Sequence, residues 1–378
     1  MSDKLKALGL CLGASTVSIV QLELDQRRPL DPAGRTKPRV MGYSLHPHEG
    51  DPKQTLLDAF NQIDLASFDR IAATGRKFRK FVNLASIPEP QAVEYAYPYV
   101  KPADVDCPAV VSAGGETFMV YALDRSGRIA NVITGNKCAS GTGEFFLQQL
   151  RRMNVSLDEA AKWSAVGEAH HVSGRCSVFC KSDCTHATNK GIPRSQVTAG
   201  LCKMMANKIL ELLKKVDRKN ILIAGGTALN HTMIKYLEKD IPGLIVPEEA
   251  PYFEALGAAL WALETETAPY PGLSGLLLKE IATFDHLPPL KDYAGQVEFK
   301  TMTTGQIQPG DNCTLGLDVG STTTKAVLLR NTDNALLASV YLRTNGDPVG
   351  ASRQCYRAIF EQVKQQIRPS EISISGLG

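Results

Sequence analysis

No apolar run in the 378-residue sequence approaches the roughly 18–20 residues that a membrane span needs. The first residues also lack the layout of a signal peptide, because their apolar stretch is short and runs straight into a strand-and-turn pattern. We therefore expect a cytoplasmic protein with no role in a membrane. An excess of one charge is missing as well: the net charge is +3 at pH 7, which is unlike the strongly basic surface of a nucleic-acid binder.

What is present is ordinary for a globular protein, with 43% hydrophobic and 21% charged residues, enough apolar material for a large core. At roughly 100–200 residues per domain, the length predicts two or three domains. The cysteines are less ordinary, because there are nine and three of them lie between Cys176 and Cys184. In a reducing compartment such clustering indicates metal or redox chemistry rather than disulfide bonds.

An internal repeat organises the sequence. Residues Leu8–Asp25 read LGLCLGASTVSIVQLELD, and residues Leu315–Asn331 read LGLDVGSTTTKAVLLRN. Each is an apolar strand, a Gly-Ser-Thr turn and a second apolar strand, which predicts a β-hairpin. A helical pattern follows each hairpin, around Thr55–Ile63 and Arg353–Ile367, and leads to a further strand, RIAATGR in the first copy and ISISGLG in the second.

The repeat divides the chain into three expected segments. We expect residues 1–265 to form one complete copy and residues 312–378 to form the N-terminal part of a second copy. Residues 266–311 are rich in proline and glycine and are expected to be a linker or a small accessory segment. Because the sequence stops just after a strand, we expect it to be a fragment cut inside its second domain.

Strands and helices alternate within the first copy, which predicts an α/β fold. Pro108–Asp124 reads as a strand, a glycine turn and a strand, and Ser140–Met153 contains a helix start followed by apolar positions at helical spacing. Val197–Val216 predicts a long helix. Asn220–Ala224 predicts a buried strand that leads into the turn GGTALN and a further helix.

Three glycine turns that follow strands are candidates for a phosphate site. Backbone N–H groups in such turns can converge on phosphate oxygens, and glycine lets the backbone approach without a Cβ clash. One such turn is most often only a hairpin turn, but three in this order, with the first type repeated, favour phosphate binding. The candidate residues are Gly13, Ser15, Thr16, Gly114, Gly115, Gly225, Gly226 and Asn230 in the first copy, and Gly320, Ser321 and Thr322 in the second.

Four cysteines are candidate metal ligands: Cys138, Cys176, Cys180 and Cys184. The last three are spaced four residues apart, which places them on one face of a helix if that segment is helical. Thiolates bind iron–sulfur clusters or zinc, and the polar neighbours of these three favour a position near a surface over a position in a core. A buried, apolar role is expected instead for Cys11, Cys107, Cys202 and Cys355.

These segments resemble a known family: the ATP-dependent activators of 2-hydroxyacyl-CoA dehydratases and the related ATPase subunits of benzoyl-CoA reductase. The matching motifs are NKCASGTGEFF (Asn136–Phe146), GRCSVFC (Gly174–Cys180), GGTALN (Gly225–Asn230) and DVGSTTTK (Asp318–Lys325). The resemblance spans nearly the whole chain. It implies an α/β, actin-like (ribonuclease H-like) ATPase fold with two subdomains, followed here by the start of a second copy.

The resemblance also implies an activity. Family activators are homodimers with one [4Fe–4S] cluster at the interface, held by two cysteines from each subunit, and Cys138 and Cys176 match those positions. ATP with Mg²⁺ binds between the two subdomains. Its hydrolysis changes the geometry at the cluster, and one low-potential electron passes from a donor such as ferredoxin or flavodoxin to the dehydratase or reductase. This is a reaction of anaerobic metabolism.

The sequence departs from the family pattern at the phosphate turns. Family members carry an Asp before the first turn and a Lys seven residues later; the second copy has them as Asp318 and Lys325, whereas the first copy has Cys11 and Ser18. The second turn reads SAGGET instead of Asp-x-Gly-Gly-Gln-Asp, which leaves Glu116 as its acidic candidate. The candidate catalytic residues are therefore Glu116, Asp318 and Lys325. Because a carboxylate for hydrated Mg²⁺ and a cation for phosphate are lost, we expect the first copy to bind nucleotide poorly or to be a pseudo-ATPase.

Cys180 and Cys184 exceed the two-cysteine pattern of the family, and either complete a cluster within one chain or are bystanders. The tandem copies also suggest an intramolecular pseudo-dimer in place of a homodimer. Two other functions stay open. A small-molecule kinase of the same superfamily shares the glycine turns without needing the cysteines, and a non-catalytic, zinc-stabilised interaction module would use the cysteines alone.

Overall fold

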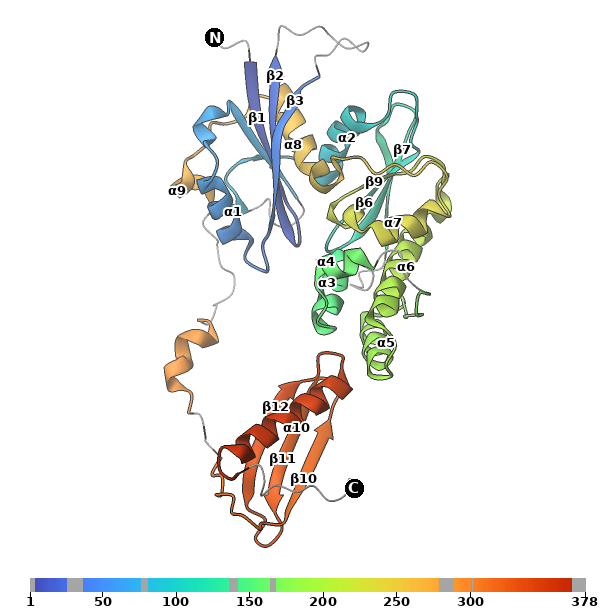
Figure 1. The fold of residues 1–378 in the computed structure, drawn as a ribbon. Helices are drawn as coiled ribbons and strands as arrows, with labels where there is room; N and C mark the ends of the chain where they lie inside the picture. The colour runs from blue at the N-terminus through green and yellow to red at the C-terminus, as the bar shows by residue number, and fades with distance from the viewer. Residues whose placement is uncertain are drawn as a thin grey trace. The chain divides into compact units, whose positions relative to one another are not determined.

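The computed structural model describes residues 4–25, 37–75, 81–135, 142–163, 168–278, 288–298, 300 and 302–368. The chain divides into two compact units (Figure 1). The first unit comprises Met1–Leu150, Ser156–Lys181 and Ser195–Glu280, and the second comprises Arg151–Val155, Ser182–Arg194 and Ile281–Gly378. No helix in the described part of the chain is long and apolar enough to cross a membrane.

The first sheet of the first unit begins with the predicted hairpin. Strands β1 and β2 pair antiparallel across the turn that follows Leu12, as the sequence predicts, and β1 pairs parallel with β4 on its other side. The sheet has the order β3-β2-β1-β4-β5. Its strands are β1 (Lys4–Leu12), β2 (Thr16–Asp25), β3 (Arg39–Pro47), β4 (Arg70–Thr74) and β5 (Ala85–Ser86).

The second sheet of the first unit has the order β8-β7-β6-β9. The predicted strand, glycine turn and strand form the antiparallel pair β6 and β7, and β9 lies parallel to β6 as the buried strand before GGTALN. The strands are β6 (Ala109–Ala113), β7 (Phe118–Leu123), β8 (Ile129–Thr134) and β9 (Leu222–Ala224). Every residue of β6 and β9 is buried, which explains their continuous apolar sequence.

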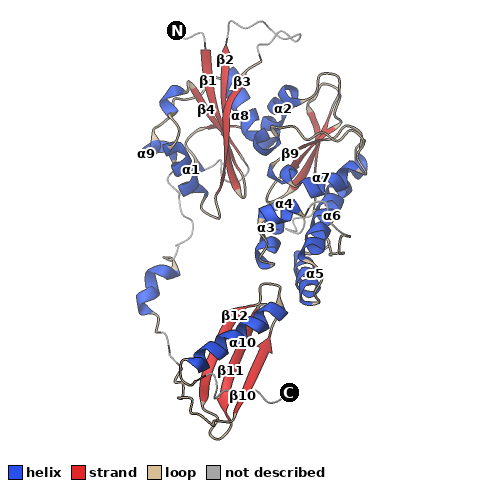
Figure 2. Cartoon of the chain, viewed as in Figure 1, coloured by secondary structure: helices blue, strands red, loops and turns tan. Residues whose placement is uncertain are grey.

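Helices lie beside both sheets (Figure 2). The helices that precede β10 in the chain also include η6, which belongs to the second unit. The α-helices are α1 (Pro52–Asn61), α2 (Glu89–Val100), α3 (Gly143–Arg152), α4 (Leu157–Lys162), α5 (Ser177–Asn189), α6 (Arg194–Leu212), α7 (His231–Glu238), α8 (Phe253–Glu264) and α9 (Leu273–Leu276). Short 3₁₀ helices are η1 (Leu65–Ser67), η3 (Leu213–Lys215), η4 (Gly226–Leu229), η5 (Ala250–Tyr252) and η6 (Leu290–Gln296). The predicted long helix thus begins at Arg194 and its α-helical part ends at Leu212.

Helix α8 joins the two sheets of the first unit, because it packs on β1 and β4 and against α2. Small residues allow the close approach: a Cβ on Gly9 would lie 2.1 Å from the Ala255 carbonyl oxygen, and a Cβ on Gly257 would lie 1.9 Å from that of Ala92. One buried apolar cluster contains residues of α8, of the first sheet and of the second sheet. The two sheets therefore share a core.

The second unit repeats the strand-strand-strand-helix order with which the first unit begins. Strands β10 (Cys313–Val319), β11 (Thr323–Arg330) and β12 (Leu336–Arg343) form an antiparallel sheet in that order, and α10 (Pro348–Lys364) packs on it. The hairpin and the helix predicted for the second copy are confirmed. The strand predicted within ISISGLG, at 372–378, lies outside the described residues.

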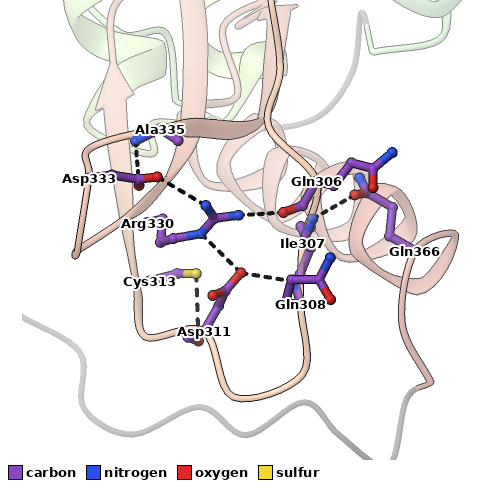
Figure 3. Close-up of polar contacts among 9 residues, drawn as sticks. All are labelled: Gln306, Ile307, Gln308, Asp311, Cys313, Arg330, Asp333, Ala335 and Gln366. Carbon is purple, nitrogen blue, oxygen red and sulfur yellow. Dashed lines mark hydrogen bonds and ion pairs between the residues drawn. The ribbon is translucent and has the colours of Figure 1, made fainter.

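An arginine binds the segment before β10 to this sheet (Figure 3). The Arg330 guanidinium donates to Asp311 Oδ2 at 3.1 Å, to Asp333 Oδ2 at 3.0 Å and to the Gln306 carbonyl oxygen. Ile307 is buried in the core of the unit, and its N–H donates to Gln366 Oε1. Part of the segment expected as a linker, 266–311, is thus packed against the second unit.

Candidate nucleotide site and cysteine segment

The turn between β1 and β2 is held from both ends. The Gly13 N–H donates to the Thr16 carbonyl oxygen at 3.1 Å, and the His48 N–H donates to that of Ser15 at 3.1 Å. The buried His48 ring accepts from the Gly50 N–H at Nδ1 (3.1 Å), and its Nε2 lies 3.3 Å from the Gly13 carbonyl oxygen. A neutral imidazole that accepts at Nδ1 carries its proton on Nε2, so Nε2 donates to the Gly13 carbonyl oxygen.

The second unit builds the same turn between β10 and β11, where Ser321 lies. The Gly320 N–H donates to the Thr323 carbonyl oxygen at 3.0 Å, and the Thr344 N–H donates to that of Thr322 at 2.9 Å. The Thr344 hydroxyl donates to the Gly320 carbonyl oxygen at 2.7 Å, in the place that the His48 ring takes in the first unit. The two turns therefore share one backbone design with different side chains behind it.

A pair of residues faces each other across the two strands beside each turn, and this pair is charged in the second unit and uncharged in the first. In the second unit Asp318 faces Lys325 across β10 and β11, and Lys325 Nζ lies 2.9 Å from Asp318 Oδ2. The hydrogen bond to Asp318 raises the pKa of Lys325 above its ordinary value. In the first unit Cys11 faces Ser18 at the matching place across β1 and β2. The structure thus aligns the charged pair of one copy with the neutral pair of the other.

The second glycine turn, between β6 and β7, lies against the first turn. A Cβ on Gly115 would lie 2.3 Å from Ser15 Oγ, so only glycine fits there without displacing Ser15. The Gly114 carbonyl oxygen accepts from the Gly143 N–H and from Thr227 Oγ1, each at 3.3 Å. The beginnings of α3 and η4 therefore converge on this turn. Glu116 follows it and is exposed.

The third glycine turn follows β9. Gly225 has φ +94° and would place a Cβ 2.6 Å from the Ala113 carbonyl oxygen, so this position requires glycine. Gly226 begins η4, and a Cβ added there would meet nothing within 4 Å. Asn230 caps α7, because its Oδ1 accepts from the Met233 N–H at 3.0 Å. The structure thus brings the three predicted turns of the first copy together and gives Asn230 a role as a helix cap.

Glu144 is a residue of this site that was not among the candidate residues predicted from the sequence. It lies in the first turn of α3, and its Oε2 accepts from Ser15 Oγ at 3.1 Å. Its N–H donates to the Gly115 carbonyl oxygen at 2.9 Å. Glu144 therefore touches both the first and the second turn. A signal existed in the sequence, since Glu144 directly follows the motif SGTG, but its partner Ser15 is 129 residues away.

The cysteine segment is helical from Ser177 onward, which was the condition for placing its cysteines on one face, but its exposure differs from the expectation. Cys176 precedes α5 and is half-buried, whereas Cys180 and Cys184 lie within α5 and are 0% and 2% exposed. The expectation that these thiols lie near a surface is therefore wrong for Cys180 and Cys184. Cys138 lies outside the described residues. Within the described ranges, no group of three or more His, Cys, Asp and Glu side chains is arranged to hold a metal ion.

The cysteines expected to be buried divide in the same way. Cys107, Cys202 and Cys355 are buried, as expected, and Cys11 is half-buried. Burial raises the pKa of Cys202 to about 11. Asn230 Nδ2 lies 3.3 Å from the Cys202 sulfur. This thiol is therefore neutral at physiological pH and belongs to the core beside the third turn.

The sequence from β4 to α8 decides the family. The model of the BadF/BadG/BcrA/BcrD ATPase family matches residues 72–262, which is half of the chain. The chain belongs to this family. The matched residues include the second and third glycine turns, Glu144 and the cysteine segment, while the first turn and the Asp318–Lys325 pair lie outside them.

Curated relatives of this family member include two activators. The 2-hydroxyisocaproyl-CoA dehydratase activator of Clostridioides difficile is 28% identical over 158 residues, covering 41% of this chain and 59% of the relative. The (R)-2-hydroxyglutaryl-CoA dehydratase activating ATPase of Acidaminococcus fermentans is 29% identical over 156 residues, covering 40% and 60%. A subunit of the benzoyl-CoA reductase of Thauera aromatica is 28% identical over 162 residues, covering 40% and 57%. The matches thus span about three fifths of each relative.

Solved structures of two activators establish the fold of this family member. The Clostridium difficile activator with bound ADPNP aligns with a TM-score of 0.58 and 21% identity over 69% of this chain and 95% of its own. Component A of the Acidaminococcus fermentans dehydratase aligns with a TM-score of 0.56 and 20% identity, over 69% and 98%. The α/β, actin-like ATPase fold predicted from the sequence is therefore confirmed.

Proposed function

We propose that this family member is an ATP-dependent, iron–sulfur electron-transfer protein that activates a 2-hydroxyacyl-CoA dehydratase or a related acyl-CoA reductase in the cytoplasm. The observation that carries the proposal is the glycine turn between β10 and β11 with the Asp318–Lys325 pair beside it, because such a turn suits a phosphate group and the pair offers a carboxylate for hydrated Mg²⁺ and a cation. Family membership and the relatives named above support the choice of activation over the other reactions of this fold.

The nucleotide part of the proposal divides between the copies. In the second copy the exposed Asp318 carboxylate would hold hydrated Mg²⁺ and Lys325 would face a phosphate, with Gly320 and Thr322 in the turn. In the first copy the backbone of the turns fits a phosphate, but Cys11 and Ser18 supply neither charge. We propose residues 1–265 as a complete copy with weakened phosphate motifs, 266–311 as an accessory segment and 312–378 as part of the copy that hydrolyses ATP.

The cluster part of the proposal rests on Cys138 and Cys176. The donor set within the described ranges does not form a metal site by itself, since Cys180 and Cys184 are buried. Cys176 is half-buried and precedes a helix whose next side chains, Val178 and Phe179, are 67% and 64% exposed. It therefore fits a cluster whose other thiolates come from a second subunit or a second copy. Such a cluster, once bound, would supply one-electron transfer at low potential from a ferredoxin or flavodoxin.

The test is anaerobic reconstitution of the full chain with iron and sulfide. We expect a brown protein with acid-labile sulfide, and an electron paramagnetic resonance signal after reduction. Cys138→Ala and Cys176→Ala should each abolish the signal. Cys180→Ala and Cys184→Ala should retain it, because these buried thiols cannot reach a shared cluster.

Cys107→Ala is the matched control, since Cys107 is buried in the core of the first unit and should not affect iron content. Retention of a full cluster in the double variant Cys138→Ala, Cys176→Ala would refute the assignment. A colourless protein loaded with zinc would favour the interaction module instead.

A further inference from the structure

One side chain occupies the point where the first two glycine turns meet. Glu144 Oε2 accepts from the Ser15 hydroxyl at 3.1 Å, and the Glu144 N–H donates to the Gly115 carbonyl oxygen at 2.9 Å. The turns are so close that a Cβ on Gly115 would overlap Ser15 Oγ, at 2.3 Å. The carboxylate therefore lies at the first turn, where Ser15 Oγ and, at 3.4 Å, Gln148 Nε2 donate to its two oxygens.

The groups that hold this carboxylate are of the kind that hold a phosphate. A hydroxyl in a glycine turn and the N-terminal turn of a helix both favour an anion, and the carboxylate oxygens accept hydrogen bonds as phosphate oxygens do. Glu144 uses the Ser15 hydroxyl as an intramolecular ligand. A nucleotide phosphate that approached this turn would have to displace Glu144 or lie next to a negative charge.

The neighbouring strands of the first copy increase this conflict. In the second copy, Lys325 and Asp318 stand beside the turn as a cation for phosphate and a carboxylate for hydrated Mg²⁺. At the matching places, facing each other across β1 and β2, the first copy has Cys11 and Ser18. At these two places the first copy therefore has neither a cation nor a carboxylate, and it carries an anion on the turn itself.

We propose that Glu144 is a specificity-determining residue that places its own carboxylate in the phosphate position of the first turn and excludes anionic nucleotides from the first copy. The inference rests on the proposed function, since it takes the turns as a nucleotide site. It goes further in naming the side chain that closes the site in one copy. The first copy then serves as a nucleotide-free half of the molecule.

Calorimetric titration of the full chain with Mg·ATP tests this inference, using variants that separate charge from occupancy. Glu144→Gln keeps the shape and a hydrogen-bond acceptor for Ser15 but removes the charge, whereas Glu144→Ala removes both. We expect affinity to rise at least about tenfold in Glu144→Gln, from the loss of one like-charge contact, and further in Glu144→Ala. Each variant is also measured in combination with Asp318→Asn. This combination distinguishes a gain of Mg·ATP affinity in the first copy from Mg·ATP binding in the second.

The matched control is Asp158→Asn, because Asp158 is an exposed acid in the first turn of another helix, α4. The affinity of Asp158→Asn for Mg·ATP should equal that of the unchanged protein. Equal or weaker binding by Glu144→Ala, in a chain that does bind Mg·ATP, would overturn the inference and leave the proposed function standing. Absence of Mg·ATP binding in every variant would refute the nucleotide assignment of the turns and the inference with it.

Discussion

The imidazole of His48 and the hydroxyl of Thr344 lie behind matching turns of the two units. The backbone N–H of each residue donates to the carbonyl oxygen of the third residue of its turn. Each side chain contacts the carbonyl oxygen of the glycine that begins the turn. The shared feature is therefore a hydrogen bond to the backbone, and either side chain can supply it. The sequence of the two copies alone gives no reason to match a histidine with a threonine.

This match predicts which substitutions the first turn tolerates. His48→Thr should retain the turn, whereas His48→Ala should speed hydrogen exchange of the Gly13 amide by up to about tenfold, because one hydrogen bond contributes about 1 kcal/mol. Exchange measured by nuclear magnetic resonance or mass spectrometry checks this. His46→Ala is the control, since the His46 ring contacts Ser44 on β3 and not the turn. Unchanged Gly13 exchange in His48→Ala would show that the ring does not support the turn.

The Asp318–Lys325 pair predicts a titration. The hydrogen bond to Asp318 raises the pKa of Lys325 above its ordinary value of 10.5, so the charged pair is fully formed at neutral pH. Its contribution to stability is present below pH 10.5 and is lost as the pH rises through the raised pKa. Asp318→Asn should return the pKa of Lys325 toward its ordinary value, measured by ¹³C resonance of the lysine side chain.

The control for this titration is Glu361→Gln, which removes a carboxylate that pairs with Lys364 in the same unit. It should leave the titration of Lys325 unchanged. A Lys325 pKa that stays equally raised in Asp318→Asn would show that another group raises it.

At the scale of elements, the sequence predicted what depends on neighbours along the chain. Alternating apolar residues and glycine turns were enough to predict the hairpins β1–β2, β6–β7 and β10–β11, because strand pairing across a short turn is local. The spacing of the cysteines placed them on one face only on the condition that the segment is helical, and Cys180 and Cys184 do lie within the helix α5. The burial of Cys180 and Cys184 was not predictable, because their neighbours along the chain are partly or fully exposed.

Contacts between distant elements were the part that the sequence could not supply. Glu144 reads as an ordinary acid at a helix start, a favourable position in any helix, until the fold places Ser15 beside it. The sequence of α8, FEALGAALWALE, indicates a helix of small residues. It does not indicate that Ala92 packs against Gly257 or that Gly9 packs against Ala255. Packing partners of this kind are set by the whole fold.

The packing of α8 predicts a large effect from one added methyl group. Gly257→Ala would place a Cβ 1.9 Å from the Ala92 carbonyl oxygen, so α8 or α2 must shift. We expect a loss of about 1–3 kcal/mol in the free energy of unfolding, typical of overpacking. Urea unfolding measures it.

Gly42→Ala on β3 is the matched control, because a Cβ there meets nothing within 4 Å. It should leave stability unchanged or raise it by roughly 0.4–1 kcal/mol through the unfolded chain. Equal stability of the two variants would mean that α8 and α2 can separate at no cost.

At the scale of the whole molecule, the two units have separate apolar clusters, which predicts separate unfolding transitions. Arg330 belongs to the second unit, where its ion pairs connect Asp311 and Asp333 to β11. Arg330→Ala should lower the unfolding temperature of the second unit and leave the transition of the first unit unchanged in differential scanning calorimetry. A shift of both transitions together would show that the units unfold as one.

Lys364→Ala serves as the control for this comparison. Lys364 pairs with Glu361 within one helix, and an exposed pair of this kind contributes little. The variant should therefore keep both transitions. The sequence predicted the existence of two copies, but the inclusion of Gln306 and Ile307 in the second unit depends on hydrogen bonds that no repeat could indicate.

Cys11 faces Ser18 across the strands of the first unit, and Asp318 faces Lys325 in the second. The two residues of each pair therefore have to be changed together. Anyone who wishes to restore charge in the first copy must install aspartate and lysine together, because a lone aspartate would face a hydroxyl and a lone lysine would face a thiol. A library of single substitutions would never contain aspartate and lysine together, so it would miss the charged pair. Paired mutagenesis is therefore the appropriate way to ask whether a charged pair changes nucleotide binding by the first copy.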